Sequence, residues 1–143
     1  MAVSRGATQG RWDLAAIRAG IGVCLILAIP FSLVAVIVDS ESSGLNAVLF
    51  FGAMFGFVVG GGCAAWLQQR GTPMSHGLVT TLVAYVGAQC VFLVIRLARG
   101  ADVNWFGLLF TLSLVVLAGV FGGILGSQLQ ARGFVPSTQR EAT

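Results

Sequence analysis

Four long segments of the chain are mostly apolar and contain no charged residue, namely residues 19–38, 44–67, 77–95 and 106–129. Each is close to the roughly 20 apolar residues that an α-helix needs to cross a lipid bilayer. Beside four such spans, a chain of 143 residues has little room for a separate soluble domain. The sequence therefore predicts one all-α domain over residues 1–143, a polytopic four-helix transmembrane bundle.

The overall composition supports lipid as the main solvent of the chain. Hydrophobic residues make up 57% of it, charged residues 9%, and the mean hydropathy is +0.92. Soluble domains have about 45–50% apolar and about 25% charged residues. The first apolar segment, Ala19–Val38, could instead be a cleavable signal peptide. It is longer than the roughly 7–15 residues of such a signal, however, and no convincing cleavage site follows it. We expect a retained helix that Pro30 kinks or locally weakens.

A sequence repeat links the second and fourth segments. GGGCAAWLQQRG at residues 60–71 returns as GGILGSQLQARG at residues 122–133, with six of the twelve aligned positions identical. Each copy is the second half of an apolar segment and its polar exit. We expect two fused helical hairpins that insert the same way up, as parallel repeats. The expected units are residues 15–73 and 77–136, with helices at about 15–38, 45–67, 77–96 and 106–129.

The distribution of arginine predicts the orientation. All eight basic residues are Arg, and six of them flank the ends of the apolar segments that lie on the side of the termini: Arg5, Arg11, Arg18, Arg70, Arg132 and Arg140. Arg96 and Arg99 lie on the other side. Positive residues stay in the cytoplasm, which predicts a plasma-membrane protein with both termini cytoplasmic. No basic cluster with interleaved aromatic residues is present, so we expect no nucleic-acid partner.

Small residues recur every four positions in two segments. One ladder is Gly52, Gly56, Gly60 and Ala64; the last segment carries Ala118, Gly122 and Gly126 on one face and Gly119, Gly123 and Ser127 on the next. Small residues allow helices to approach closely in lipid, where apolar burial provides little drive for association. We expect all of these positions to pack helices. Two ladders on one helix further suggest that one serves a partner, either a second copy or a larger membrane complex.

Groups for catalysis or ion coupling are missing from the spans. No Asp, Glu, Lys, Arg or His lies in the central part of any apolar segment, although such residues are the usual markers of function inside a membrane. We therefore expect no enzyme, no metal site and no cofactor. Cys24, Cys63 and Cys90 have no metal or redox spacing and are expected to pack as small apolar residues. His76 is expected to mark a helix boundary.

One polar stripe is the candidate site. Thr81, Tyr85 and Gln89 are four residues apart, so they share a helix face that leads towards Arg96. Such a stripe in lipid either forms hydrogen bonds between helices or lines a cavity. If there is a cavity, Pro30 and Ser32 of the first segment are the expected opposite wall.

Two stretches, GGCAAWLQQRGTPMSHGLVTTLVAY and GVFGGILGSQL, resemble small four-helix bacterial membrane proteins of the YrzE-like type. In that pattern a glycine-rich helix end leads through a short turn into a His-Gly pair that starts the third helix. The resemblance covers roughly residues 60–130 and implies the four-helix fold, but it assigns no activity to any residue.

Two functions fit these features. The first is a non-enzymatic membrane protein that self-associates or is a subunit of a larger complex, as the glycine ladders suggest. The alternative is a small channel or facilitator whose pore lies between the repeats or between protomers, with Thr81, Tyr85 and Gln89 on its wall.

Overall fold

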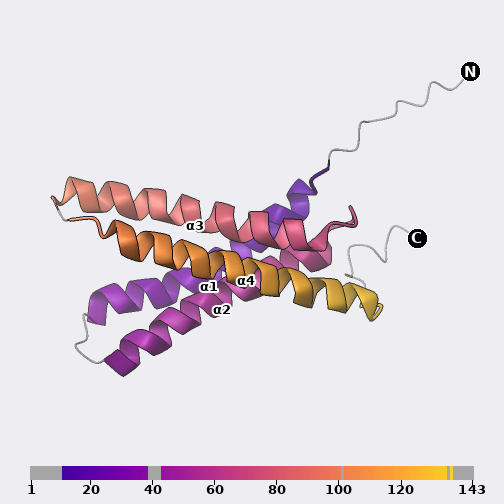
Figure 1. Cartoon of the computed structure of the whole chain (residues 1–143), viewed down its shortest axis with the longest axis horizontal. Helices are drawn as coiled ribbons and strands as arrows, with labels where there is room; N and C mark the ends of the chain where they lie inside the picture. The colour runs from indigo at the N-terminus through magenta and orange to yellow at the C-terminus, as the bar shows by residue number, and fades with distance from the viewer. Residues whose placement is uncertain (1–10, 39–42, 101, 135, 137–143) are drawn as a thin grey trace, which may run out of the picture.

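The computed structural model describes residues 11–38, 43–100, 102–134 and 136. Within them lie four α-helices and no strand: α1 (Leu14–Val38), α2 (Ser43–Leu67), α3 (Pro73–Ala98) and α4 (Trp105–Ala131). All four are long and apolar enough to cross a membrane. The predicted fold class is confirmed, and the chain is a multi-pass membrane protein built as a four-helix bundle (Figure 1).

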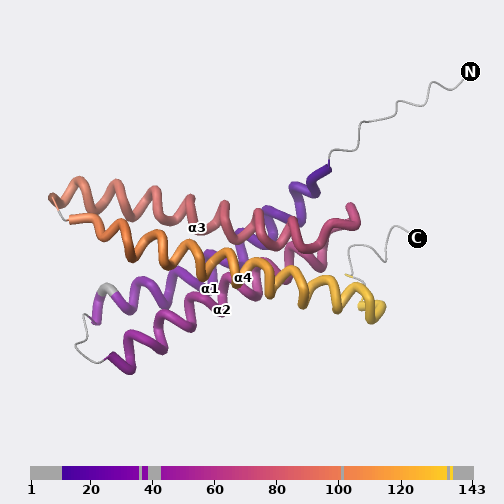
Figure 2. The backbone as a smooth tube through the Cα atoms, in the orientation of Figure 1, coloured from indigo at the N-terminus to yellow at the C-terminus, as the bar shows by residue number. Residues whose placement is uncertain are grey.

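The helices form two antiparallel hairpins, α1–α2 and α3–α4. Helix α2 contacts both helices of the second hairpin, and α1 also contacts α3. Among the described residues, α1 and α4 are the one pair of helices that do not touch. Figure 2 shows that the hairpins run close together at one end and diverge towards the other. We call the first the termini end, where α1 and α3 begin and α2 and α4 end, and the second the hairpin end, where α1 and α3 end and α2 and α4 begin.

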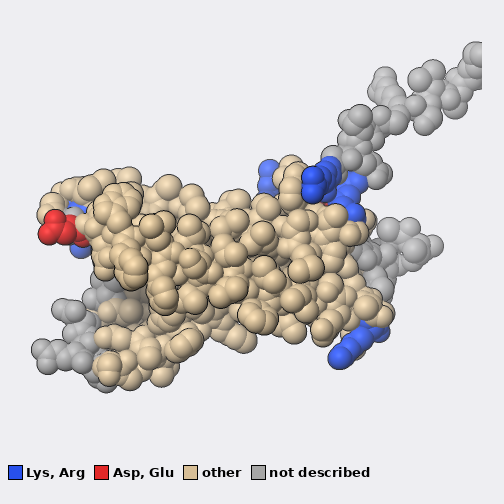
Figure 3. All heavy atoms as spheres, viewed as in Figure 1, with Lys and Arg blue, Asp and Glu red and all other residues tan. Residues whose placement is uncertain are grey.

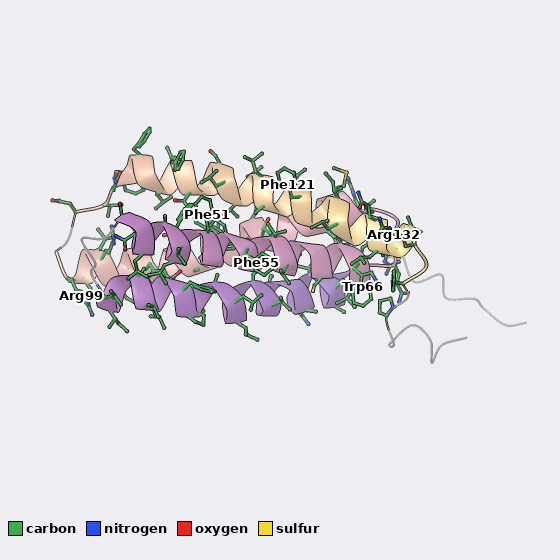
Figure 4. The ribbon with its side chains drawn as sticks, turned by 90° about the horizontal axis from the view of Figure 1, so that it is seen from below. Phe51, Phe55, Trp66, Arg99, Phe121 and Arg132 are labelled. Atoms are coloured by element: carbon green, nitrogen blue, oxygen red, sulfur yellow. The ribbon has the colours of Figure 1, made fainter. Side chains whose placement is uncertain are left out.

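Charged side chains gather at the two ends of the bundle. On the face drawn in Figure 3, the length between the ends carries no Lys, Arg, Asp or Glu. Figure 4 places Arg132 at the termini end and Arg99 at the hairpin end, with Phe51, Phe55 and Phe121 along the length between them. These three phenylalanines are 60–68% exposed. A band of exposed apolar side chains between two charged rims is what a lipid bilayer solvates.

Glycines bring the helices together in the half of the bundle nearest the termini end. A methyl group on Gly126 would lie 2.5 Å from the Gly62 carbonyl oxygen and 2.6 Å from Ala65 Cβ. One on Gly122 would meet the backbone of α2 at the Val58 oxygen and at the Gly62 nitrogen, the latter at 2.7 Å. Backbone atoms cannot rotate away, so α2 and α4 reach this separation only without side chains at these positions.

The two ladders on α4 face different helices of the same chain. Gly122 and Gly126 lie against α2, whereas Gly119 and Gly123 lie against the first turns of α3; Ala118 is buried in the core cluster. A methyl group on Gly123 would be 2.9 Å from Met74 Cα. Both ladders are therefore used inside the bundle, so neither one by itself indicates a partner.

The ladder on α2 packs against α1. Gly52 faces the Phe31 ring, Gly56 faces Leu27 and Ala28, Gly60 faces Cys24, and Ala64 is fully buried. A methyl group on Gly20 of α1 would in turn lie 2.7 Å from both Ala64 Cβ and the Gly60 oxygen. Because small residues face each other, the backbones of α1 and α2 come into contact, as those of α2 and α4 do.

Helix α3 begins four residues earlier than the predicted residue 77, at Pro73. Pro73 reads in the sequence as part of a turn after α2, but proline is also favoured in the first turn of a helix, where its missing N–H group has no intrahelical partner to lose. The left-handed turn before it is formed at Gly71, with φ of 71°. Because the helix starts at Pro73, His76 lies inside its first turn and points into the bundle, where it is fully buried.

Candidate functional site

A cavity of about 410 Å³ lies at the hairpin end, where α1 diverges from α3 and α4. Its volume is within the roughly 300–1,000 Å³ of small-molecule sites. Three helices and the α3–α4 connection supply its polar side chains: Ser32, Tyr85, Gln89, Arg96, Asn104 and Thr111. The cavity therefore lies between the two hairpins, with most of its wall on the second.

Only part of the polar stripe predicted on α3 lies in this cavity. Tyr85 and Gln89 line it, and Ser32 of α1 is on the opposite wall as expected. Thr81 does not reach it: the side chain is fully buried against Gly119, and its hydroxyl donates to the Leu78 carbonyl oxygen at 3.0 Å. Among the described residues, Thr81 therefore packs without a hydrogen bond between helices, Tyr85 both lines the cavity and donates to the Leu108 carbonyl oxygen of α4, and Gln89 lines the cavity. Pro30 is not among the lining residues.

A second, mostly apolar recess of about 180 Å³ adjoins the cavity and shares Ser32, Tyr85, Gln89 and Thr111 with it. Its further wall comes from α1 and α2: Leu25, Ala28, Phe50, Ala53, Met54 and Phe57. The joined space thus changes from charged and polar side chains near Arg96 to apolar side chains near Phe57. Along α3, the 11 positions from Arg96 to Tyr85 correspond to about 16 Å of helix.

Three hydroxyl groups on the wall have their protons engaged within the chain. Ser32 donates to the Ala28 carbonyl oxygen at 3.0 Å, Thr111 to that of Gly107 at 2.9 Å, and Tyr85 to that of Leu108 at 2.8 Å. Each oxygen keeps lone pairs that can accept a further hydrogen bond. Towards a bound molecule these groups therefore act as acceptors.

The side-chain donors of the wall that have no partner among the described residues lie on α3 and, at Asn104, just before α4. The Gln89 amide and the Arg96 guanidinium make no hydrogen bond with any residue that the structure describes, and Asp102 forms no ion pair with Arg96. Asn104 uses its side-chain oxygen to accept from the Gly107 N–H at 2.9 Å, which fixes the start of α4. Gln89 and Arg96 are thus the side chains best placed to bind a ligand.

The cavity ends halfway along the bundle. Tyr85 packs edge-on against Phe57, with ring centroids 6.3 Å apart, and Ala84 and the fully buried Val115 lie beside them in the same core cluster. Beyond this level the glycine contacts of α2, α3 and α4 leave no room for a side chain. In the part of the chain that the structure describes, the cavity therefore ends at Tyr85 and lies in the half of the bundle nearest the hairpin end.

Polar contacts hold the termini end closed. His76 Nε2 accepts a hydrogen bond from the Asp13 backbone N–H at 2.9 Å, while its Nδ1 lies 2.9 Å from the Thr72 carbonyl oxygen. These two partners fix the neutral Nδ1–H tautomer, since Nε2 must be free to accept. The centroid of the Trp12 ring lies 5.3 Å from that of the His76 imidazole. One buried side chain thus ties the start of α1 to the start of α3 across the two hairpins.

The two equivalent glutamines of the repeated motif meet at the same end. Gln130 donates its amide to the Trp66 and Gln68 carbonyl oxygens at 2.8 and 2.9 Å, and Gln68 donates to the Gln130 side-chain oxygen at 3.3 Å. The Gln68 side-chain oxygen also accepts from the Arg70 and Thr72 N–H groups, which shapes the α2–α3 connection. This amide pair satisfies helix-end carbonyl groups that α2 could not otherwise pair.

The contacts of His76, the place of Thr111 in the cavity wall and the pairing of two glutamines were not predicted from the sequence. The identity of Gln68 and Gln130 in the repeat was a usable signal for their pairing, and the position of Thr111 in an apolar segment was a signal for the cavity. Nothing in the sequence indicates that His76 meets Asp13, 63 positions away. In the part of the chain that the structure describes, no group of three His, Cys, Asp or Glu residues could hold a metal ion.

No protein-family model, no curated protein and no solved structure matches the chain. The features that bear on function are therefore the cavity and the contacts that close the opposite end.

Proposed function

We propose that the chain is a non-enzymatic facilitator of the plasma membrane that binds a small solute in the cavity at the hairpin end and lets it cross. The observation that carries the proposal is the cavity itself, where the Gln89 and Arg96 donors have no partner among the described residues and both hairpins contribute to the wall. Arg96 is exposed at the end of α3, whereas the half-buried Gln89 amide lies within the span, where a polar group is a usual marker of function.

The proposed crossing uses the two hairpins as the moving bodies. We infer that they are two copies of one duplicated unit, with the termini in the cytoplasm, so that the hairpin end faces outwards. In transporters built from repeats the site lies at the repeat interface and alternating access comes from rocking of one repeat against the other. The cavity here is likewise at the interface between hairpins, and rocking would open the termini end as the hairpin end closes.

The buried hydroxyl of Thr80 supports a second conformation in which the termini end is open. Thr80 Oγ1 is fully buried on α3 and is the one buried side-chain oxygen or nitrogen without a partner in the described residues. The Thr80 side chain faces Gly20 of α1, at the seam between the hairpins. An unpaired buried hydroxyl costs free energy, which opening of this seam to water would recover.

The flux of small solutes tests the proposal. In proteoliposomes we expect the wild-type protein to pass at least one member of a panel of small neutral and anionic solutes, and Gln89→Leu to reduce that flux to the level of protein-free vesicles. The Gln89 amide has no structural partner to lose, so the variant should fold. Cys90→Leu, the neighbouring and exposed position on the same helix, is the matched control and should keep full flux.

Two results would contradict the proposal. One is the absence of flux for every solute with a folded wild-type protein; the other is equal flux through wild type and Gln89→Leu. Self-association or service as a subunit of a larger complex would then remain as the role. The glycine ladders do not support that role, because they pack inside the bundle. The exposed Phe51, Phe55 and Phe121 suit contact with lipid as well as with a partner.

A further inference from the structure

The joined cavity and recess have three chemical zones in a fixed order. Arg96 lies at the open end, the polar side chains of Ser32, Gln89 and Thr111 line the middle, and the α2 residues Phe50, Ala53 and Phe57 line the far end. A simple polar solute would fill the first two zones and leave the third empty. A purely apolar molecule would bury the Gln89 and Arg96 donors without partners, at a cost in free energy.

We propose that this site takes an anionic amphiphile, with a phosphate or carboxylate head at Arg96, a polar linker in the middle and an alkyl chain in the apolar recess. This deepens the proposed function, on which it rests, by naming the class of ligand. A planar guanidinium binds both oxygens of such a head group at once, and among the residues that the structure describes no acid is paired with Arg96.

The middle zone specifies the linker. The oxygens of Ser32, Tyr85 and Thr111 have donated their protons to backbone carbonyl groups and can only accept. A linker that carries a hydroxyl or amide N–H group satisfies them, while its own oxygen can accept from the Gln89 amide. A glycerol linker with one free hydroxyl has this pattern, so the ligand chemistry matches a single-chain lysophospholipid or another single-chain anionic amphiphile with a hydroxyl or amide beside its head group.

The position of the opening suits such a ligand. Arg96 lies at the end of α3, near the rim of the membrane, and the recess lies deeper in the span. An amphiphile in the outer leaflet has its head group and chain at these same relative depths. It could therefore enter between α1 and the second hairpin, which diverge at this end, without reversing its orientation.

Binding measured by native mass spectrometry in a non-ionic detergent tests the inference. The probes are 1-lauroyl lysophosphatidic acid, dilauroyl phosphatidylglycerol, dodecyltrimethylammonium and inorganic phosphate. We expect one equivalent of the lysophosphatidic acid to bind, because it alone carries an anionic head, a free linker hydroxyl and one alkyl chain, and no binding of the cationic amphiphile or of inorganic phosphate. Preference for phosphatidylglycerol, whose linker has no hydroxyl, would overturn the proposed linker.

Two variants locate the head group and the chain. Arg96→Gln should weaken binding of the anionic probe about tenfold or more, because a charged hydrogen-bonding partner is lost, whereas Arg99→Gln at the same end should not. Arg99 is outside the cavity wall, which makes it the matched control. Ala88→Phe, which fills the apolar recess, should also weaken binding.

The outcomes separate this inference from the proposed function. Equal binding of anionic and cationic amphiphiles, or an unchanged affinity in Arg96→Gln, would overturn the inference. Flux of a small polar solute with no amphiphile bound would also overturn the inference about the ligand class. The same result would support the proposal that the chain is a facilitator. One bound anionic amphiphile without flux of any kind would instead uphold the ligand class and reject the facilitator.

Discussion

Gly122→Leu should destabilise the folded bundle by about 3 kcal/mol or more, a large effect for one substitution. Any side chain at this position meets the backbone of α2 at Val58, Gly61 and Gly62, and a backbone cannot move aside as a flexible side chain can. The two hairpins must then separate along the α2–α4 seam. Unfolding followed by circular dichroism during titration with a denaturing detergent measures the loss.

Gly87→Ala and Gly22→Ala are the controls for Gly122→Leu. A methyl group at either position meets nothing within 4 Å, although both glycines lie inside helices. Helix propensity favours alanine there by about 1 kcal/mol, so these variants should be as stable as wild type or more so. If Gly122→Leu kept wild-type stability and changed only the size of the protein–detergent complex, Gly122 would belong to a partner interface and the internal packing would be wrong.

His76→Leu should lower the stability of the bundle by about 2 kcal/mol, chiefly because it leaves the partly buried Asp13 N–H without its acceptor. The Thr72 carbonyl oxygen loses less, since it still accepts from the Ser75 hydroxyl at 3.0 Å. Amide exchange of residues 12–17 should rise most, because the start of α1 loses its tie to α3.

His76→Gln distinguishes this hydrogen bond from simple loss of volume. The Gln side-chain oxygen can reach towards the place of Nε2 and accept from Asp13, so this variant should recover part of the stability and most of the exchange protection. Met74→Leu, an exposed position in the same turn, should behave as wild type. Equal losses for His76→Leu and His76→Gln would show that the side chain acts by packing alone.

The four helices could be predicted because apolar length is a property of the sequence itself. The starting residue of α3 was the exception. Pro73 can follow one helix or begin the next, and only the packing of His76 decides between these two positions. The i, i+4 and i+8 spacing correctly placed Thr81, Tyr85 and Gln89 on one side of α3, but it could not show where Gly77 and Gly119 bring α3 against α4. That contact separates the packed Thr81 from Tyr85 and Gln89 in the cavity.

The contacts at the termini end show the same limit. The repeat marked Gln68 and Gln130 as equivalent, yet only the proximity of α2 and α4 makes them partners. Asp13 meets His76 through a backbone N–H, which carries no side-chain signature. A local pattern therefore indicated which residues are unusual, whereas the glycine-controlled helix spacing determined what those residues contact.

Accessibility of single cysteines to a membrane-impermeant thiol reagent tests the proposal that the cavity is accessible to water, opens outwards and stops before Thr81. The background replaces Cys24, Cys63 and Cys90 with alanine. Gln89→Cys and the end marker Arg99→Cys should react when the reagent is added to right-side-out vesicles, and Thr81→Cys should react from neither side. Labelling of Arg99→Cys without labelling of Gln89→Cys would contradict the cavity, and labelling of Gln89→Cys from the cytoplasmic side alone would contradict its direction.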